Sequence, residues 1–184
     1  MLKNEFVTSD LHFNHANIIK YCNRPFSSSE EMDQSLIKRW NAKVRKNDPV
    51  YILGDVIFFK SHKLDYAKHI IQSLNGKLHL VKGNHDRSTE ELKDLFVWIK
   101  DYHEMTLLDG TKVVMSHYPF LVWNKAHYGS WMLHGHSHGS LKETDSKRMD
   151  VGIDTNPDYC PYSFEEIKEK MKNKNFVKED HHGY

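Results

Sequence analysis

The sequence predicts an α/β protein with a parallel sheet in its first half and a hairpin-rich second half. Short apolar segments alternate with amphipathic helical segments over roughly the first hundred residues. Asp109-Gly110 separates two strand-like runs, which indicates a hairpin. No repeat, linker or low-complexity stretch interrupts the 184 residues. We therefore expect a single domain over residues 1–184, with a tail from about residue 175.

The first half is expected to begin with a strand, a long helix and two further strands. Short apolar runs at 5–9, 50–53 and 78–81 predict the three strands, because each ends at a polar residue or at a glycine. Ser28 and Glu31 form a capping box, which predicts the start of the helix. Apolar residues then recur every four positions and define one face of that helix: Met32, Leu36, Trp40 and Val44.

Three more helices and four more strands complete the predicted order. Ser61 can cap a helix with an apolar face of Leu64, Ala67, Ile71 and Leu74. The capping box at 88–91 predicts a helix with an apolar side of Leu92, Leu95, Phe96 and Ile99. Strands are expected at 105–108, 112–115, 131–133 and 149–153. The capping box at 163–166 predicts a last helix that ends near residue 171.

The composition narrows the classes of function. Lys and Arg total 26 against 25 Asp and Glu, a net charge of +1, so the basic excess typical of nucleic-acid-binding proteins is missing. Nucleic acid is not excluded as a substrate, but no electrostatic feature favours it. Two distant cysteines, Cys22 and Cys160, and the lack of a signal-like or membrane-length apolar segment predict a cytoplasmic protein without a membrane partner. Histidine occurs 14 times, which favours a metal site.

Polar residues follow the predicted strands at five places. Ligands bind at the carboxyl ends of strands in open α/β sheets, so these residues should share one edge. Each motif is weak by itself, since an Asp or Gly-Asp after a strand is often only a turn. The five segments are Asp10-Leu11-His12, Gly54-Asp55, Gly83-Asn84-His85-Asp86, Ser116-His117 and Gly135-His136-Ser137-His138.

Taken together, these segments predict a site for metal ions. Carboxylate and amide oxygens mixed with imidazole nitrogens suit Mn²⁺, Fe or Zn²⁺, and the absence of thiolate argues against a cysteine-based structural zinc site. Seven ligands are too many for one tetrahedral ion. They suit two ions that share one carboxylate.

The five segments, in this order, resemble the motifs of the calcineurin-like metallophosphoesterases. The resemblance covers residues 6 to about 154 and is closest to small single-domain members from bacteria and phages. It implies a four-layer α/β/β/α sandwich with mixed sheets and two divalent transition-metal ions between the loops. Mn²⁺ is the expected ion, with Fe, Zn²⁺ or Ni²⁺ as alternatives.

The resemblance also implies a role for each residue of the motifs. One metal ion would be held by Asp10, His12 and His138. The other ion would be held by Asn84, His117 and His136. Asp55 would bridge the two ions, and His85 would be the acid near the leaving group, oriented by Asp86. The chain departs from many relatives after Asp55, where the usual Asp and Arg are missing, and this weakens any analogy to protein Ser/Thr phosphatases.

The resemblance implies hydrolysis of a phosphate ester by a metal-bridging hydroxide, and we expect a phosphodiesterase acting on a small or nucleotide-like substrate. A phosphomonoesterase of the same family and a non-catalytic metal-binding scaffold are the alternatives. A nuclease is disfavoured by the balanced charge. The oligomeric state is left open.

Two residues after the first motif are candidate substrate contacts. Arg24 precedes Pro25, which favours an extended backbone at Arg24, and a guanidinium suits bidentate contacts to phosphate. We therefore expect Arg24 to bind a phosphate oxygen of the substrate, with a solvated surface position as the alternative. His15 is close enough in sequence to His12 to face the substrate or to support a ligand, or it could be an ordinary surface histidine.

Overall fold

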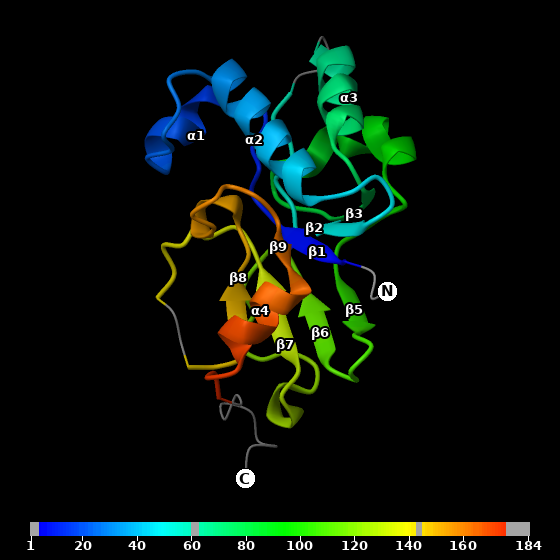
Figure 1. Ribbon diagram of the computed structural model, residues 1–184, viewed down its shortest axis with the longest axis vertical. Helices are drawn as coiled ribbons and strands as arrows, with labels where there is room; N and C mark the ends of the chain where they lie inside the picture. Colours follow the sequence, from blue (N-terminus) through cyan, green and yellow to red (C-terminus); the bar gives the residue numbers. More distant parts are fainter. Residues whose placement is uncertain (1–3, 60–62, 143–144, 176–184) are drawn as a thin grey trace.

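The computed structural model describes residues 4–59, 63–142 and 145–175, and its strands form two sheets (Figure 1). The first sheet has the order β4-β3-β2-β1-β9, in which β9 alone is antiparallel to its neighbour. Its strands are β1 (Phe6–Thr8), β2 (Pro49–Ile52), β3 (Lys77–Val81), β4 (Trp98–Lys100) and β9 (Tyr162–Ser163).

The second sheet has the order β5-β6-β7-β8. Its first two strands form the predicted antiparallel hairpin, and the other two pairings are parallel. The strands are β5 (His103–Thr106), β6 (Lys112–Met115), β7 (Trp131–His134) and β8 (Arg148–Asp150). The five polar motifs follow the carboxyl ends of five strands: β1, β2, β3, β6 and β7. Within each sheet these strands pair in parallel, so their carboxyl ends lie at the same edge of that sheet.

Helices cover the outer face of the first sheet, above it in Figure 1. They are α1 (Ala16–Tyr21), α2 (Ser29–Lys43), α3 (Leu64–Ser73) and the 3₁₀ helix η2 (Asp86–Leu95). Met32, Leu36 and Trp40 of α2 are buried in one core with Val50 and Ile52 of β2, as the spacing of four predicts. Ser28 caps α2 by accepting a hydrogen bond from the Glu31 amide (3.1 Å).

A second core lies between the two sheets. Because side chains alternate along a strand, Tyr51 and Leu53 face away from the helices and pack with Met115 and Leu133 of the second sheet. The opposite face of the second sheet is covered by the loop that contains the 3₁₀ helix η3 (Ala126–Tyr128). Two further helices are α4 (Phe164–Met171), which packs into the second core, and the 3₁₀ helix η4 (Ile153–Thr155).

The predicted α/β fold with mixed sheets is confirmed, and the capping box of α4 is present in both directions. The helix predicted from residue 88 with Ile99 on its face is wrong. A 3₁₀ helix already begins at Asp86 and ends at Leu95, and Ile99 lies in β4, where it pairs with Leu80. The free edge of β3 offers backbone hydrogen bonds to this segment, and they outweigh the local helical pattern.

Two predictions fall outside the described residues: the Ser61 cap of α3 and most of the tail from about residue 175. Within the described part of the chain, no helix is long and apolar enough to span a bilayer.

Candidate metal centre

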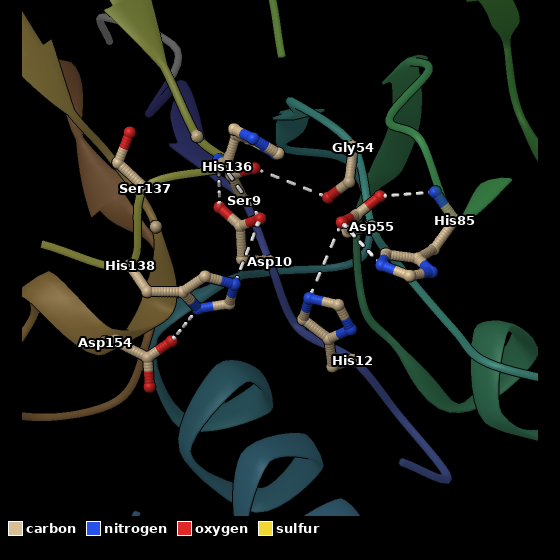
Figure 2. A network of polar contacts seen from close by, with 12 residues as sticks. Ser9, Asp10, His12, Gly54, Asp55, His85, His136, Ser137, His138 and Asp154 are labelled. Carbon is tan, nitrogen blue, oxygen red and sulfur yellow. Dashed lines mark hydrogen bonds and ion pairs between the residues drawn. The ribbon is translucent and has the colours of Figure 1, made fainter. Parts of the chain in front are cut away.

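The structure brings together the seven residues that the sequence predicts as metal ligands. They come from five loops, and Figure 2 shows the side chains from four of these loops pointing toward one another. Asp10 and His12 follow β1, Asp55 follows β2, Asn84 follows β3, His117 follows β6, and His136 and His138 follow β7.

Five of these seven residues have a left-handed backbone. The φ angles are 57° at Asp10, 52° at His12, 53° at Asp55, 67° at His136 and 47° at His138. Such a conformation costs a residue with a side chain about 1–2 kcal/mol. Strain of this kind gathers at sites where function determines the direction of a side chain. Hydrogen bonds between the loops hold it, for example from the Asp10 amide to the Gly54 carbonyl (3.0 Å).

The first group of ligand atoms consists of Asp10, His12 and His138. Their candidate donor atoms all lie within 4.8 Å of one another, and His138 Nε2 is 3.8 Å from Asp10 Oδ1. His138 Nδ1 donates a hydrogen bond to Asp154 Oδ2 (2.7 Å). Its Nε2 is therefore the nitrogen that faces the group.

The second group consists of Asn84, His117 and His136. His117 Nε2 and His136 Nδ1 each lie 3.0 Å from Asn84 Oδ1. His117 Nδ1 donates to the Leu53 carbonyl (2.8 Å), and burial lowers the pKa of His117. A neutral ring with its proton on Nδ1 turns a lone pair of Nε2 toward the Asn84 oxygen. His117 Nε2 and Asn84 Oδ1 would then both be acceptors, and a cation bound between them would remove the repulsion of their lone pairs.

Asp55 joins the two groups. One carboxylate oxygen, Oδ2, lies 3.5 Å from His12 Nε2 and 3.6 Å from His117 Nε2. The other, Oδ1, accepts a hydrogen bond from the backbone amide of His85 (2.9 Å). Asp55 is buried, so its carboxylate stands between one imidazole from each group.

These residues fit divalent ions. Among the described residues, His12 Nε2 is a buried nitrogen without a hydrogen-bond partner. Burial raises the pKa of Asp10 to about 8 and lowers the pKa of His12 to about 2. A buried carboxylate needs a compensating cation, and a neutral imidazole is the form that binds a metal.

The carboxylates of Asp55 and Asp10 lie where a side chain on Gly83 or Gly135 would otherwise be placed. A Cβ on Gly83 would lie 2.2 Å from Asp55 Oδ1, and one on Gly135 would lie 2.5 Å from Asp10 Oδ2 and 1.9 Å from Ser9 Oγ. Both contacts are too short for any side chain.

We expect Gly135→Ala to lower both the melting temperature and the affinity for Mn²⁺, because the added methyl group must displace Ser9 and Asp10. Gly110→Ala is a suitable control, since a Cβ there meets nothing within 4 Å and only the φ of +86° opposes it. The control should lose about 1–2 kcal/mol of stability and no metal affinity. Thermal melts and calorimetric Mn²⁺ titrations measure both quantities, and equal behaviour of the two variants would contradict the expectation.

His85 lies beside the two groups with an accessible side chain. Its Nε2 is 4.0 Å from Asp55 Oδ2, and 41% of the side chain is exposed. Its ring is in edge contact with His12 at a centroid distance of 5.4 Å. Asp86, predicted to orient this ring, is buried and accepts hydrogen bonds from the amides of Gly83, Asp55 and Val56 (2.7–3.1 Å). These contacts show Asp86 holding the two loops together through their backbones.

The structure corrects the prediction for Arg24. Its side chain is fully buried, and the guanidinium binds both oxygens of Asp154 (2.7 and 2.8 Å). The carbonyls of Asp10 and Leu11 accept its other hydrogen bonds (2.7 and 2.8 Å). A buried guanidinium with these partners has no face left for a substrate phosphate.

Asp154 is the residue that the sequence reasoning missed. It contacts His138 and Arg24 and is itself nearly buried. It follows β8 by four residues, as the other polar motifs follow their strands, and this position was the available signal.

His15 lies at the rim of the site. Its Nδ1 is 3.2 Å from His12 Nδ1, and its ring stacks on Phe58 at a centroid distance of 4.8 Å. Burial lowers the pKa of His15. The position is compatible with either predicted role, support of His12 or contact with a substrate.

A cavity of about 560 Å³ opens onto the two groups. Its lining includes His12, Asp55 and His85 of the site, together with Ile18 and Tyr21 of α1. A volume of this size accommodates a small organic ligand.

Proteins similar to this chain come from archaea, phages and bacteria. An uncharacterized protein of Methanocaldococcus jannaschii is 42% identical over 135 residues, which cover 73% of this chain and 69% of that protein. The gene 66 protein of Mycobacterium phage D29 is 28% identical over 197 residues, covering 92% of this chain and 96% of that protein. The crystal structure of a protein of unknown function from Aquifex aeolicus matches with a TM-score of 0.73 and 25% identity, covering 91% of this chain and 98% of that one.

The family comparison agrees with the geometry of the loops. Residues 6–182 match the model of the calcineurin-like phosphoesterases, a range that includes all five polar motifs and both sheets. The match agrees with the order of the motifs, the mixed sheets and the candidate metal ligands of this protein. The chain belongs to the calcineurin-like phosphoesterase family.

Proposed function

We propose that this protein is a dinuclear metal-dependent phosphodiesterase that acts on a small or nucleotide-like substrate. The observation that best supports two ions is the position of Asp55 Oδ2, which lies 3.5 Å from an imidazole nitrogen of one ligand group and 3.6 Å from one of the other. A carboxylate shared in this way is the arrangement that two-metal hydrolases use.

The proposed ions are two divalent transition metals, with Mn²⁺ expected and Fe, Zn²⁺ or Ni²⁺ as alternatives. Asp10, His12 and His138 would hold one ion, and Asn84, His117 and His136 would hold the other. When bound, such ions neutralise charge on phosphoryl oxygens and lower the pKa of water.

The protein's own residues contribute orientation and a proton. His85 is the exposed imidazole next to the bridging carboxylate, so a proton on its Nε2 can be given to the departing oxygen of the substrate. Asp86 fixes the loop that contains His85 by binding the amides of Gly83 and Asp55. Proton donation to a poor leaving group accelerates its departure by about 10²–10⁴-fold.

The cavity supports a small substrate. Its volume of about 560 Å³, lined in part by Ile18 and Tyr21, leaves room for one organic group beyond the phosphate. Tyr21 is exposed, so an aromatic or nucleobase group could stack on it. The same cavity would accept a phosphomonoester, and a substrate panel separates the two activities.

The test is hydrolysis of matched diesters and monoesters by the Mn²⁺-loaded protein. Bis-(4-nitrophenyl) phosphate, 4-nitrophenyl phosphate and cyclic nucleotides should be compared at equal concentration. The proposal expects a higher kcat/KM for the diesters. A preference for monoesters would identify a phosphomonoesterase, and no turnover on any substrate with both ions bound would favour a scaffold.

The acid role of His85 can be tested separately. We expect His85→Ala to keep both ions and to lose about 10²–10⁴-fold in kcat on alkyl esters, whose leaving oxygen needs a proton. Nitrophenyl esters need less protonation and should lose much less. His69→Ala, on the exposed surface of α3, is the control and should change neither rate. Equal losses on the two ester types would remove His85 from this role.

A further inference from the structure

A buried ion pair joins two distant parts of the chain next to the candidate metal centre. Arg24 Nε and Nη2 bind Asp154 Oδ1 and Oδ2 at 2.7 and 2.8 Å, although the residues are 130 positions apart. The exposed fractions of the two side chains are 0% and 5%. A buried pair of this kind is weak evidence for stability, because the desolvation of both charges offsets their attraction. Its position therefore calls for another explanation.

On one side, the pair orients His138. Asp154 Oδ2 accepts the proton of His138 Nδ1 at 2.7 Å, and this fixes the tautomer and turns Nε2 toward Asp10 Oδ1, 3.8 Å away. Figure 2 shows His138 between Asp154 and Asp10. A carboxylate that binds the far nitrogen of a metal-ligating histidine holds its ring in position and increases its basicity.

On the other side, the pair holds the backbone of the first motif. Arg24 Nη2 donates to the carbonyl of Asp10 (2.7 Å), and Nη1 donates to that of Leu11 (2.8 Å). Asp10 and His12 both have a left-handed backbone, with φ of 57° and 52°. Arg24 therefore stabilises the strained segment that contains two of the three members of the first ligand group.

The second ligand group lacks these contacts among the described residues. His117 is oriented by the Leu53 carbonyl instead, and His136 is connected to Asp10 through its backbone amide (2.9 and 3.1 Å). The effect of the pair should therefore fall on one ion rather than on both.

A third metal site at the pair is disfavoured. Cys22, His138 and Asp154 have donor atoms within 4.8 Å of one another. However, the guanidinium of Arg24 already neutralises Asp154, and a cation placed there would be repelled by it.

We propose that Arg24 and Asp154 are positioning residues that set the affinity of the metal subsite formed by Asp10, His12 and His138. This inference rests on the proposed dinuclear function. Arg24 fixes the loop that contains Asp10 and His12, and Asp154 fixes the imidazole of His138. The ion pair between them keeps the loop and the imidazole at a constant distance from each other.

The test is calorimetric titration of Mn²⁺ into the metal-free protein. Wild type should bind two ions. Asp154→Asn keeps the size of the side chain but loses its charge, and the dissociation constant of one ion should rise about 10–100-fold while that of the other stays within twofold. Lys43→Met is the matched control, because it removes an ion pair with Glu166 that also spans distant parts of the chain, 123 positions apart, away from the site. The control should bind both ions as wild type does.

A second measurement uses the unmodified protein and does not depend on a variant that folds. Imidazole nitrogen NMR of the Zn²⁺-loaded wild type should show the proton of His138 on Nδ1, assigned by comparison with His138→Gln. A proton on Nε2 would contradict the inference.

The outcomes also separate this inference from the proposed function. If wild type binds two ions and Asp154→Asn binds both with unchanged affinity, the positioning role is wrong and the dinuclear proposal stands. Equal weakening of both ions would likewise reject a role confined to one subsite. If the wild type binds no Mn²⁺, the dinuclear proposal fails, and this inference fails with it.

Discussion

Removal of divalent ions should abolish hydrolysis completely, and Mn²⁺ should restore it. In the proposed mechanism the nucleophile is water, and without the ions no group would lower its pKa or neutralise the phosphoryl oxygens. Burial of Asp10, which raises its pKa to about 8 in the absence of a cation, should also make the metal-free protein less stable. At a Mn²⁺ concentration 100 times Kd, each site should contribute about 2.7 kcal/mol to the free energy of unfolding.

Activity and thermal melting should be measured on the same chelated sample, before and after Mn²⁺ is added. Ca²⁺ is the control ion, because it prefers six to eight oxygen ligands and the candidate site offers mostly imidazole nitrogens. It should restore neither quantity well. Full turnover by protein shown to be free of metal by mass spectrometry would overturn the mechanism.

Asp55→Asn should reduce kcat/KM by about three orders of magnitude, equivalent to about 4 kcal/mol of transition-state stabilisation. The variant keeps the shape of the side chain and its contact with the His85 amide. It loses the negative charge between His12 Nε2 and His117 Nε2. Because both ligand groups share this carboxylate, both ions should bind more weakly.

Asp101→Asn is the matched control for this variant. Asp101 is exposed and pairs with Lys82 at the surface, so its removal should change stability by less than about 1 kcal/mol and leave metal content unchanged. Metal analysis of the purified proteins and steady-state kinetics give the comparison. An Asp55→Asn protein that retains two ions and wild-type turnover would reduce Asp55 to a turn residue.

The sequence predicts that the metal ligands come together, because each ligand can be recognised from the few residues around it. Asp10, Asp55 and Asn84 each follow a short apolar strand, and parallel strands deliver their carboxyl ends to one edge of a sheet. The alternation of side chains along β2 and the spacing of four along α2 are equally local, and both the sheet and the helix were predicted.

The features that escaped prediction depend on distant partners. Arg24 was expected to bind a substrate phosphate, because its actual partner Asp154 lies 130 positions away. Ile99 fits the face of a helix, but the vacant edge of β3 decides its conformation. Asp86 seemed placed to orient its neighbour His85, whereas the amides of Asp55 and Val56 come to it from another loop. No pattern within one segment contains these contacts.

The antiparallel pairing of β9 with β1 has a consequence for the order of folding. Phe6 pairs with Ser163, so the strand that leads to Asp10 gains its second neighbour only from a segment more than 150 positions later. Closing so large a loop costs conformational entropy, and the contacts of β9 with β1 offset this cost only after the loop has closed. Such long-range pairing slows folding. During synthesis, β1 therefore remains an edge strand, open to unwanted pairing, until residues 162–163 emerge.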